Sequence, residues 1–271
     1  MQEFTRLVEI MATLRGPNGC PWDREQTLQT LSQFVLEEAY EVVDAIERDD
    51  LAALREEIGD HIFEGVFLAQ IAADRGAFGV ADSLRAVSDK LVRHHPHVFR
   101  DDGQVHDAAS KERAPSADAA LSRWDTQKAQ ERAAAGHTGA TLGDLPHGLP
   151  ALLRAYKLGK RAAGVGFDWT RAGDVVDKIE EEVAELRETL ASEPSNTDRA
   201  EEEMGDLLFA IANLSRKLGI DPEAALRNAN RKFEKRFTAM EARIGESGRR
   251  MREMTLEELE AEWQRTKATF E

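Results

Sequence analysis

The sequence predicts an all-α protein built from two tandem helical repeats. Three observations support this prediction: helix-favouring residues dominate the chain, apolar residues recur at helical spacing, and one pattern of acidic residues occurs twice. Aromatic residues make up only 6% of the chain and only 8 of 271 residues are proline, whereas Ala, Leu, Glu and Arg are abundant throughout. These four residue types lose little free energy on entering a helix, so helices are expected from end to end.

The duplicated acidic pattern defines the two repeats. In the first half, Glu-Glu-Ala-Tyr-Glu at 37–41 precedes Glu-Glu-Ile-Gly-Asp at 56–60. In the second half, Glu-Glu-Val-Ala-Glu at 181–185 precedes Glu-Glu-Met-Gly-Asp at 202–206. Such self-similarity indicates a duplicated domain.

The domain boundaries follow from where the helical pattern stops. Gly, Pro and Asp gather between about 101 and 148, so we assign 1–100 to an N-terminal domain, 101–148 to a linker and 149–271 to a C-terminal domain. The linker contains one short helical piece around 117–133. Its Trp124 and Lys128 match Trp263 and Lys267 near the end of the chain, which predicts the same short final helix in both repeats.

Apolar residues three and four positions apart predict amphipathic helices in both repeats. Asp174 and Asp221 are placed to start two of the helices, the second followed by Pro222. Short polar links favour antiparallel helix pairs, and each pair has a broad apolar stripe with few helices to cover it. We therefore expect a homodimer in which equivalent repeats form four-helix bundles. The stripes are Leu28, Leu31, Val35, Ala39, Val42 and Ile46, and Val176, Ile179, Val183, Leu186 and Leu190.

Charge and composition exclude several classes of partner. The 36 basic and 51 acidic residues give a net charge of -15, which disfavours nucleic acid, and a polyanionic substrate would need bound cations or a local basic patch. The lone Cys20 excludes an internal disulfide and a multi-cysteine zinc site. No stretch reaches the ~20 apolar residues of a membrane span, and the start does not resemble a signal peptide, so a cytoplasmic location is expected.

The repeated carboxylates are the candidate functional residues. Within each pair the two acids lie three residues apart and therefore on one side of a helix, so two packed helices can bring four carboxylates together. Such a group is unfavourable without a cation, and oxygen ligands without His or Cys suit Mg²⁺, or Mn²⁺ in its place. The candidate set of the second repeat is Glu182, Glu185, Glu203 and Asp206, and that of the first is Glu38, Glu41, Glu57 and Asp60.

Gly59 and Gly205 interrupt the predicted helices beside these carboxylates. A glycine inside a helix costs roughly 1 kcal/mol relative to alanine. We expect a close approach between helices at both positions to offset that cost.

The acidic pattern, together with Gly-Cys-Pro-Trp-Asp at 19–23, His-Pro-His-Val-Phe at 95–99 and Val-Gly-Phe-Asp-Trp at 165–169, resembles the MazG family of nucleoside triphosphate pyrophosphohydrolases over nearly the whole chain. The resemblance implies that the carboxylates bind Mg²⁺, which bridges the triphosphate and helps position a water. It implies cleavage between the α and β phosphates of a broad range of nucleotides, to monophosphate and pyrophosphate, as nucleotide-pool house-cleaning. It also implies that the second repeat is catalytic.

Basic residues near the second carboxylate set supply the required local patch. Lys178 lies four residues before Glu182, and Arg199 lies four before Glu203. By resemblance, the candidate phosphate or base contacts are Lys178, Arg199, Lys232, Arg236 and Trp263. The first repeat has Ala53 and His94 where the second has Arg199 and Arg236, which also favours catalysis in the second repeat.

Three other functions share some of these sequence features. A pyrophosphohydrolase restricted to dUTP or phosphoribosyl-ATP differs from a broad one only in substrate profile. A nucleotide-sensing helical scaffold explains the helices but not the repeated carboxylates. A ferritin-like di-iron bundle requires Glu-x-x-His on two helices, and the sequence contains none.

Overall fold

The computed structural model describes residues 2–100, 102–107, 116–117, 119–120, 141–143, 145–191 and 196–270. Within these residues the protein is all-α, and the only β feature is an isolated bridge between Phe99 and Val105. The chain divides into two compact units, 1–137 and 138–271, each described separately below. Most of the predicted linker helix, with Trp124 and Lys128, lies outside the described residues, so the proposed boundaries at 100 and 148 stay a prediction.

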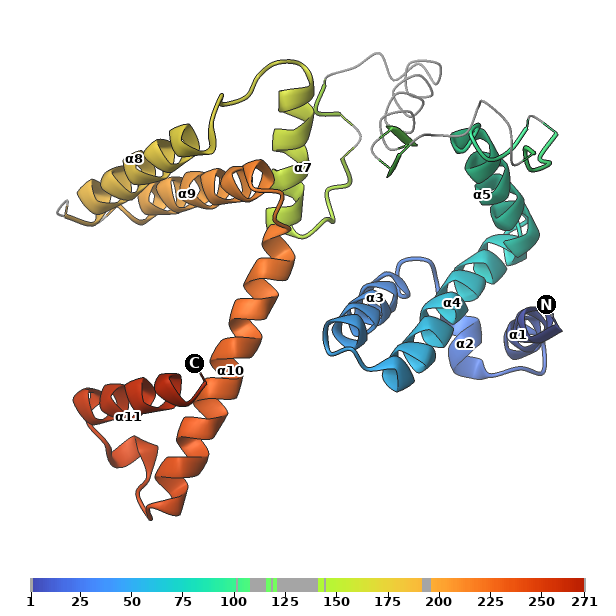
Figure 1. The fold of residues 1–271 in the computed structure, drawn as a ribbon. Coiled ribbons are helices and arrows are strands. Elements are labelled where there is room, and N and C mark those ends of the chain that lie inside the picture. The colour runs from blue at the N-terminus through green and yellow to red at the C-terminus, as the bar shows by residue number, and fades with distance from the viewer. Residues whose placement is uncertain are drawn as a thin grey trace. The chain divides into compact units, whose positions relative to one another are not determined.

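Among its described residues, the first unit contains five helices, whose arrangement Figure 1 shows. They are α1 (Gln2–Arg15), α2 (Pro21–Glu25), α3 (Ser32–Glu47), α4 (Leu51–Asp74) and α5 (Val80–His94). Helices α3 and α4 lie side by side, joined by a short turn in which Asp49 has a positive φ of 55°. Asp50 caps α4, because its Oδ1 accepts hydrogen bonds from the backbone N–H groups of Ala52 and Ala53.

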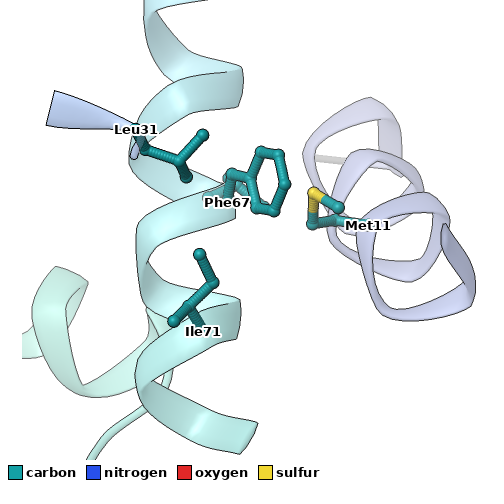
Figure 2. Close-up of a cluster of buried hydrophobic side chains, with 5 residues drawn as sticks. Met11, Leu31, Phe67 and Ile71 are labelled. Atoms are coloured by element: carbon teal, nitrogen blue, oxygen red, sulfur yellow. The ribbon is translucent and has the colours of Figure 1, made fainter. Parts of the chain in front are cut away.

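The core of the first unit lies where α4 meets α1 and the segment before α3. Figure 2 shows Phe67 pointing from α4 toward Met11 of α1, with Leu31 and Ile71 beside it. Arg15 closes the edge of this core: its Nε donates to Asp74 Oδ2 at 2.6 Å, and its guanidinium lies 5.7 Å from the centre of the Phe67 ring. One arginine thus links the end of α1 to the end of α4.

The described residues of the second unit form five α-helices and one short 3₁₀ helix, Met251–Glu253. The helices are α7 (Ala151–Gly164), α8 (Ala172–Ala191), α9 (Thr197–Lys217), α10 (Pro222–Glu246) and α11 (Leu256–Thr269). Asp221 caps α10, with Pro222 at the first helical position, as the sequence predicts. The prediction for α8 was wrong by one turn: the helix begins at Ala172, and Asp174 instead accepts a hydrogen bond from the backbone N–H of Arg171.

The two units place corresponding helices in corresponding roles. Helices α8 and α9 form an extended helix pair like α3 and α4, and α7 packs on α9 as α1 packs on α4. Helix α10, the counterpart of α5, is longer, and its far half extends away from α8 and α9 and carries α11 (Figure 1). A final short helix therefore ends the second unit.

Helix α11 is fixed to α10 by a buried carboxylate. Glu262 is only 4% exposed and forms ion pairs with Arg243, Arg249 and Arg265, each at 2.8 Å. The ring of the next residue, Trp263, lies 5.3 Å from that of Phe233 in α10. The ion pairs thus position the only tryptophan of α11.

The sequence predicts that helices approach each other closely at Gly59 and Gly205. Within a single chain this prediction is wrong. A Cβ atom added at Gly59 or Gly205 would meet no atom within 4 Å. The free-energy cost of a glycine inside a helix is therefore not offset at these two positions by packing inside either unit. Within the described ranges, no helix is both long and apolar enough to cross a lipid bilayer.

Candidate active site

Three acidic side chains of the second unit converge between α8 and α9. Glu182 and Glu185 come from one face of α8 and Glu203 from the facing side of α9, and one carboxylate oxygen of each lies within 4.8 Å of the others. The three-residue spacing on α8 places both of its glutamates on one side, toward α9. The structure thus brings together three of the four candidate carboxylates of this unit.

Two basic residues partly neutralise this cluster. Lys178 Nζ lies 2.7 Å from Glu182 Oε1 and also 2.7 Å from Glu181 Oε1, and Arg199 Nε lies 3.3 Å from Glu203 Oε1. Both contacts to the cluster span four residues on one helix, the spacing noted in the sequence. Lys178 and Arg199 are partly exposed, so their charges remain accessible to a ligand.

The cluster still lacks positive charge at its centre. Glu182 is 3% exposed, and its Oε2 atom is buried without a hydrogen-bond partner. The pKa of Glu185 is raised above its usual range, first because its carboxyl group hydrogen-bonds that of Glu203 and then because the two charges repel. An orphaned buried oxygen beside two mutually repelling carboxyl groups is the arrangement that a bound cation stabilises.

The first unit contains a similar cluster without the basic residues. One oxygen each of Glu38, Glu41 and Glu57 lies within 4.8 Å of the others. Burial, followed by repulsion from Glu41, raises the pKa of Glu38. No lysine or arginine in the described part of the chain forms an ion pair with these three groups, because Phe34 and Ala53 stand where the second unit has Lys178 and Arg199.

The remaining candidates lie apart from the converged oxygens. Asp60 and Asp206 are exposed one turn further along their helices and do not belong to either group of three. Lys232 and Arg236 lie on α10 and Trp263 on α11, and no ion pair or hydrogen bond links them to the carboxylates among the described residues. A single chain therefore assembles only part of the predicted site.

Two further features of the second unit lie on the same helices. Asp168 receives hydrogen bonds from Arg216 Nη1 at 3.2 Å and Lys217 Nζ at 2.7 Å, and Lys217 also donates to the carbonyl of Trp169, which ties the segment before α8 to the end of α9. An apolar pocket of about 490 Å³ opens between α7, α9 and α10. Its lining includes Leu158, Gly205, Leu208, Phe209 and Leu226.

Sequence reasoning missed one buried acid beside the first cluster, Glu64. It is 7% exposed and its Oε2 has no hydrogen-bond partner. The signal was present, because Glu64 lies four residues after Asp60 and therefore on the same side of α4. It was overlooked because Ala210 occupies the equivalent position in the second unit, so the repeat did not mark it.

Comparison with known proteins identifies the family. The model of the MazG nucleotide pyrophosphohydrolase domain matches residues 26–99 and 174–239, which together cover more than half of the chain and include both carboxylate clusters. The chain belongs to the MazG family. The resemblance seen in the sequence, to MazG nucleoside triphosphate pyrophosphohydrolases, is thereby confirmed.

Three relatives match this chain over nearly its whole length. The nucleoside triphosphate pyrophosphohydrolase of Escherichia coli K12 is 47% identical over 98% of both chains. The nucleoside triphosphate pyrophosphohydrolase/pyrophosphatase MazG of Thermotoga maritima is 42% identical over 97% of this chain and 95% of its own. The uncharacterized protein YabN of Bacillus subtilis is 38% identical over 98% of this chain but only 52% of its own length.

Proposed function

We propose that this MazG protein hydrolyses nucleoside triphosphates to nucleoside monophosphates and pyrophosphate at the α8 and α9 carboxylate cluster. The observation that carries the proposal is the convergence of Glu182, Glu185 and Glu203, with a buried Glu182 oxygen that lacks a partner. The family supports the reaction, as do the Escherichia coli and Thermotoga maritima relatives, which are named nucleoside triphosphate pyrophosphohydrolases and match over nearly their whole length. A broad range of ribo- and deoxyribonucleotides is the proposed substrate class.

The cluster suits Mg²⁺, with Mn²⁺ as a substitute. All its donors are carboxylate oxygens, which hard divalent cations prefer, and the orphaned Glu182 oxygen provides an unused donor. Bound there, such an ion neutralises phosphate charge and polarises water or a phosphoryl oxygen. Glu182, Glu185 and Glu203 would hold it, and Asp206 would join them through its position one turn along α9.

The basic residues of the second unit bind and orient the triphosphate in this proposal. Lys178 and Arg199 already point their charges at the carboxylates, and exchanging a carboxylate contact for a phosphate contact needs only a change of rotamer. Phosphoryl transfer depends mainly on positioning and charge neutralisation, so these contacts contribute directly to the rate. The first unit has no counterpart of either residue, which is why we assign catalysis to the second.

The remaining ligand contacts are proposed to come from a homodimer. Exposed apolar side chains remain on the paired helices of both units, among them Ile58 and Ile62 in α4 and Met204 and Ile211 in α9. Pairing of equivalent units into four-helix bundles would cover them. A second chain would also offer a route by which Lys232, Arg236 and Trp263 reach a carboxylate cluster that they do not contact within their own chain.

Product analysis tests the reaction. The pure protein is incubated with Mg²⁺ and each standard nucleoside triphosphate, and the products are separated by anion exchange. Monophosphate with pyrophosphate is expected, and turnover of several bases would distinguish a broad enzyme from one restricted to dUTP or phosphoribosyl-ATP. Diphosphate with phosphate, or no turnover in Mg²⁺, would refute the proposed reaction.

Matched substitutions test which unit is catalytic. Glu185→Ala is expected to lower kcat by about a hundredfold or more, because a metal ligand in the reacting site is removed, whereas Glu41→Ala retains most of the activity. The two residues occupy equivalent positions, so folding effects are matched. A large loss in Glu41→Ala with little in Glu185→Ala would move the active site to the first unit.

A further inference from the structure

The side chains that α11 buries are polar. Helix α11 packs on α10, and its buried residues are Glu262 and Thr266, 4% and 2% exposed. Burial of apolar side chains is non-directional, whereas ion pairs and hydrogen bonds require particular angles. A helix held by such contacts has a defined rotation about its own axis. The direction of the neighbouring Trp263 is therefore set by these polar contacts.

One guanidinium group of α10 binds two successive turns of α11. Arg243 Nη2 donates to Glu262 Oε2 at 2.8 Å, to the Glu262 carbonyl at 2.6 Å and to Thr266 Oγ1 at 3.0 Å. Arg249, which follows the end of α10, donates to Glu262 Oε1 at 2.8 Å, and Arg265 of α11 donates to the same oxygen. Both oxygens of the carboxylate are thereby occupied, so a change at Glu262 releases several contacts at once.

Trp263 contacts a row of aromatic residues on α10. Its ring centre lies 5.3 Å from that of Phe233, which in turn stacks on Phe237 at 5.7 Å. Phe233 is 56% exposed, so part of this aromatic surface is accessible in the single chain. Lys232 and Arg236 each precede one of the two phenylalanines, which places cations beside the rings along the helix. Rings next to cations suit a ligand that has both a flat base and phosphate groups.

The acid beside the tryptophan occurs in one repeat only. Trp124 of the first repeat matches Trp263, but the residue before it is Arg123 and not an acid. The same repeat also lacks counterparts of Lys178 and Arg199. The acid is thus a property of the unit that we propose to be catalytic.

We infer that Glu262 is a positioning residue for nucleotide binding: by fixing α11 on α10, it directs Trp263 toward the base of the bound triphosphate. The inference rests on the proposed function, in which Trp263 is a nucleotide contact. Glu262 itself does not touch the substrate, because its carboxylate is buried and arginines occupy both of its oxygens. Its effect is on affinity for the nucleoside part of the substrate and not on cleavage at the carboxylate cluster.

Steady-state kinetics of Glu262→Gln, which keeps the shape of the side chain and removes its charge, test the inference. KM for nucleoside triphosphates is expected to rise about fivefold or more, because one base contact is weakened, with kcat little changed. Trp263→Ala should give a similar rise, and adding Glu262→Gln to it should give little more, because both act through one ring. The control is Glu260→Gln, an exposed position on the same helix, which should leave KM unchanged.

Further measurements separate positioning from a general loss of structure. Inorganic tripolyphosphate has no base, so its inhibition constant should be the same in Glu262→Gln and in wild type. Thr266→Val removes a different partner of Arg243 and should raise KM by a smaller factor. In protein without nucleotide, the tryptophan fluorescence that Trp263→Phe removes should become more accessible to acrylamide in Glu262→Gln.

An unchanged KM in Glu262→Gln or in Trp263→Ala would overturn the inference, as would a rise in the double variant that is the full product of the two single effects. An equal rise in the inhibition constant of tripolyphosphate would also overturn it, because the loss would then extend beyond the base. Absence of nucleotide hydrolysis in wild type would instead refute the proposed function. Unchanged acrylamide quenching in Glu262→Gln would even then overturn the positioning of Trp263 by Glu262.

Discussion

Lys178 has two opposing effects at the scale of single residues. Its ammonium group lies beside the carboxylates, 2.7 Å from Glu182 Oε1. It therefore repels a free divalent cation and attracts a triphosphate. The pKa of Lys178 is raised, first by its hydrogen bond to Glu181 and then by that to Glu182, so it carries its charge throughout the neutral range. One side chain can therefore bias the site toward the metal–nucleotide complex.

Lys178→Met is expected to raise KM for nucleoside triphosphate by about tenfold, the effect of losing one charge-assisted contact. It should at the same time tighten Mn²⁺ binding in the absence of nucleotide. Steady-state kinetics and Mn²⁺ titration measure the two effects separately. An unchanged KM would show that Lys178 does not contact the substrate.

At the scale of elements, Phe67 holds α4 against α1 and so supports the first carboxylate cluster. It is 1% exposed and lies at the centre of the only buried cluster of large apolar residues in the first unit as described (Figure 2). Phe67→Ala is expected to lower the free energy of unfolding by about 3–5 kcal/mol, because it leaves a cavity. Urea denaturation measures this loss. The exposed Leu256→Ala is the control and should change stability by less than about 0.5 kcal/mol.

The link between the segment before α8 and the end of α9 depends on pH. Hydrogen bonds from Arg216, then from Lys217, lower the pKa of Asp168 to about 2. A lowered carboxyl pKa contributes stability above the ordinary value of 3.8, and that contribution is lost as pH falls toward 2. Asp168→Asn should therefore lower Tm at pH 7, and its difference from wild type should shrink between pH 4 and 2. A constant difference across that range would contradict the ion-pair explanation.

At the scale of the whole molecule, the two carboxylate clusters oppose folding when no metal is bound. The pKa values of Glu38, Glu57, Glu64 and Glu185 are all raised above 4.5, so the folded state holds protons that the unfolded state releases. The stability linked to these groups is present at low pH and falls as pH rises through the raised pKa values. In metal-free protein, Glu38→Gln should gain Tm relative to wild type as pH rises from 5 to 7, and Mg²⁺ should remove this advantage. Calorimetry with and without chelator tests both statements.

The proposed homodimer is also a property of the whole molecule. Ile58 and Met204 are equivalent residues, 45% and 44% exposed on the two paired-helix faces. Light scattering is expected to give twice the chain mass for wild type, and introduction of a charge by Ile58→Asp or Met204→Asp should weaken association. Leu256→Asp, on α11, should not. A monomeric wild type would refute the dimer.

The sequence by itself determined the helical repeats, the family and the residue types of the site. These follow from short-range regularities: apolar spacing of three and four residues, a capping Asp221 before Pro222, and carboxylates three residues apart, each set locally by the geometry of a helix.

Only the tertiary structure decided which of the candidate site residues lie close together. Packing of α8 on α9 brings Glu182, Glu185 and Glu203 together but leaves Asp206 one turn away. Lys232 and Arg236 lie on α10, the helix that also carries α11, and not beside the carboxylates. The tertiary structure also buries Glu64, an acid that the repeat pattern did not mark, and leaves open space at Gly205. Helical periodicity specifies the face on which a residue lies, whereas how far helices extend and what covers them depends on contacts between distant parts of the chain.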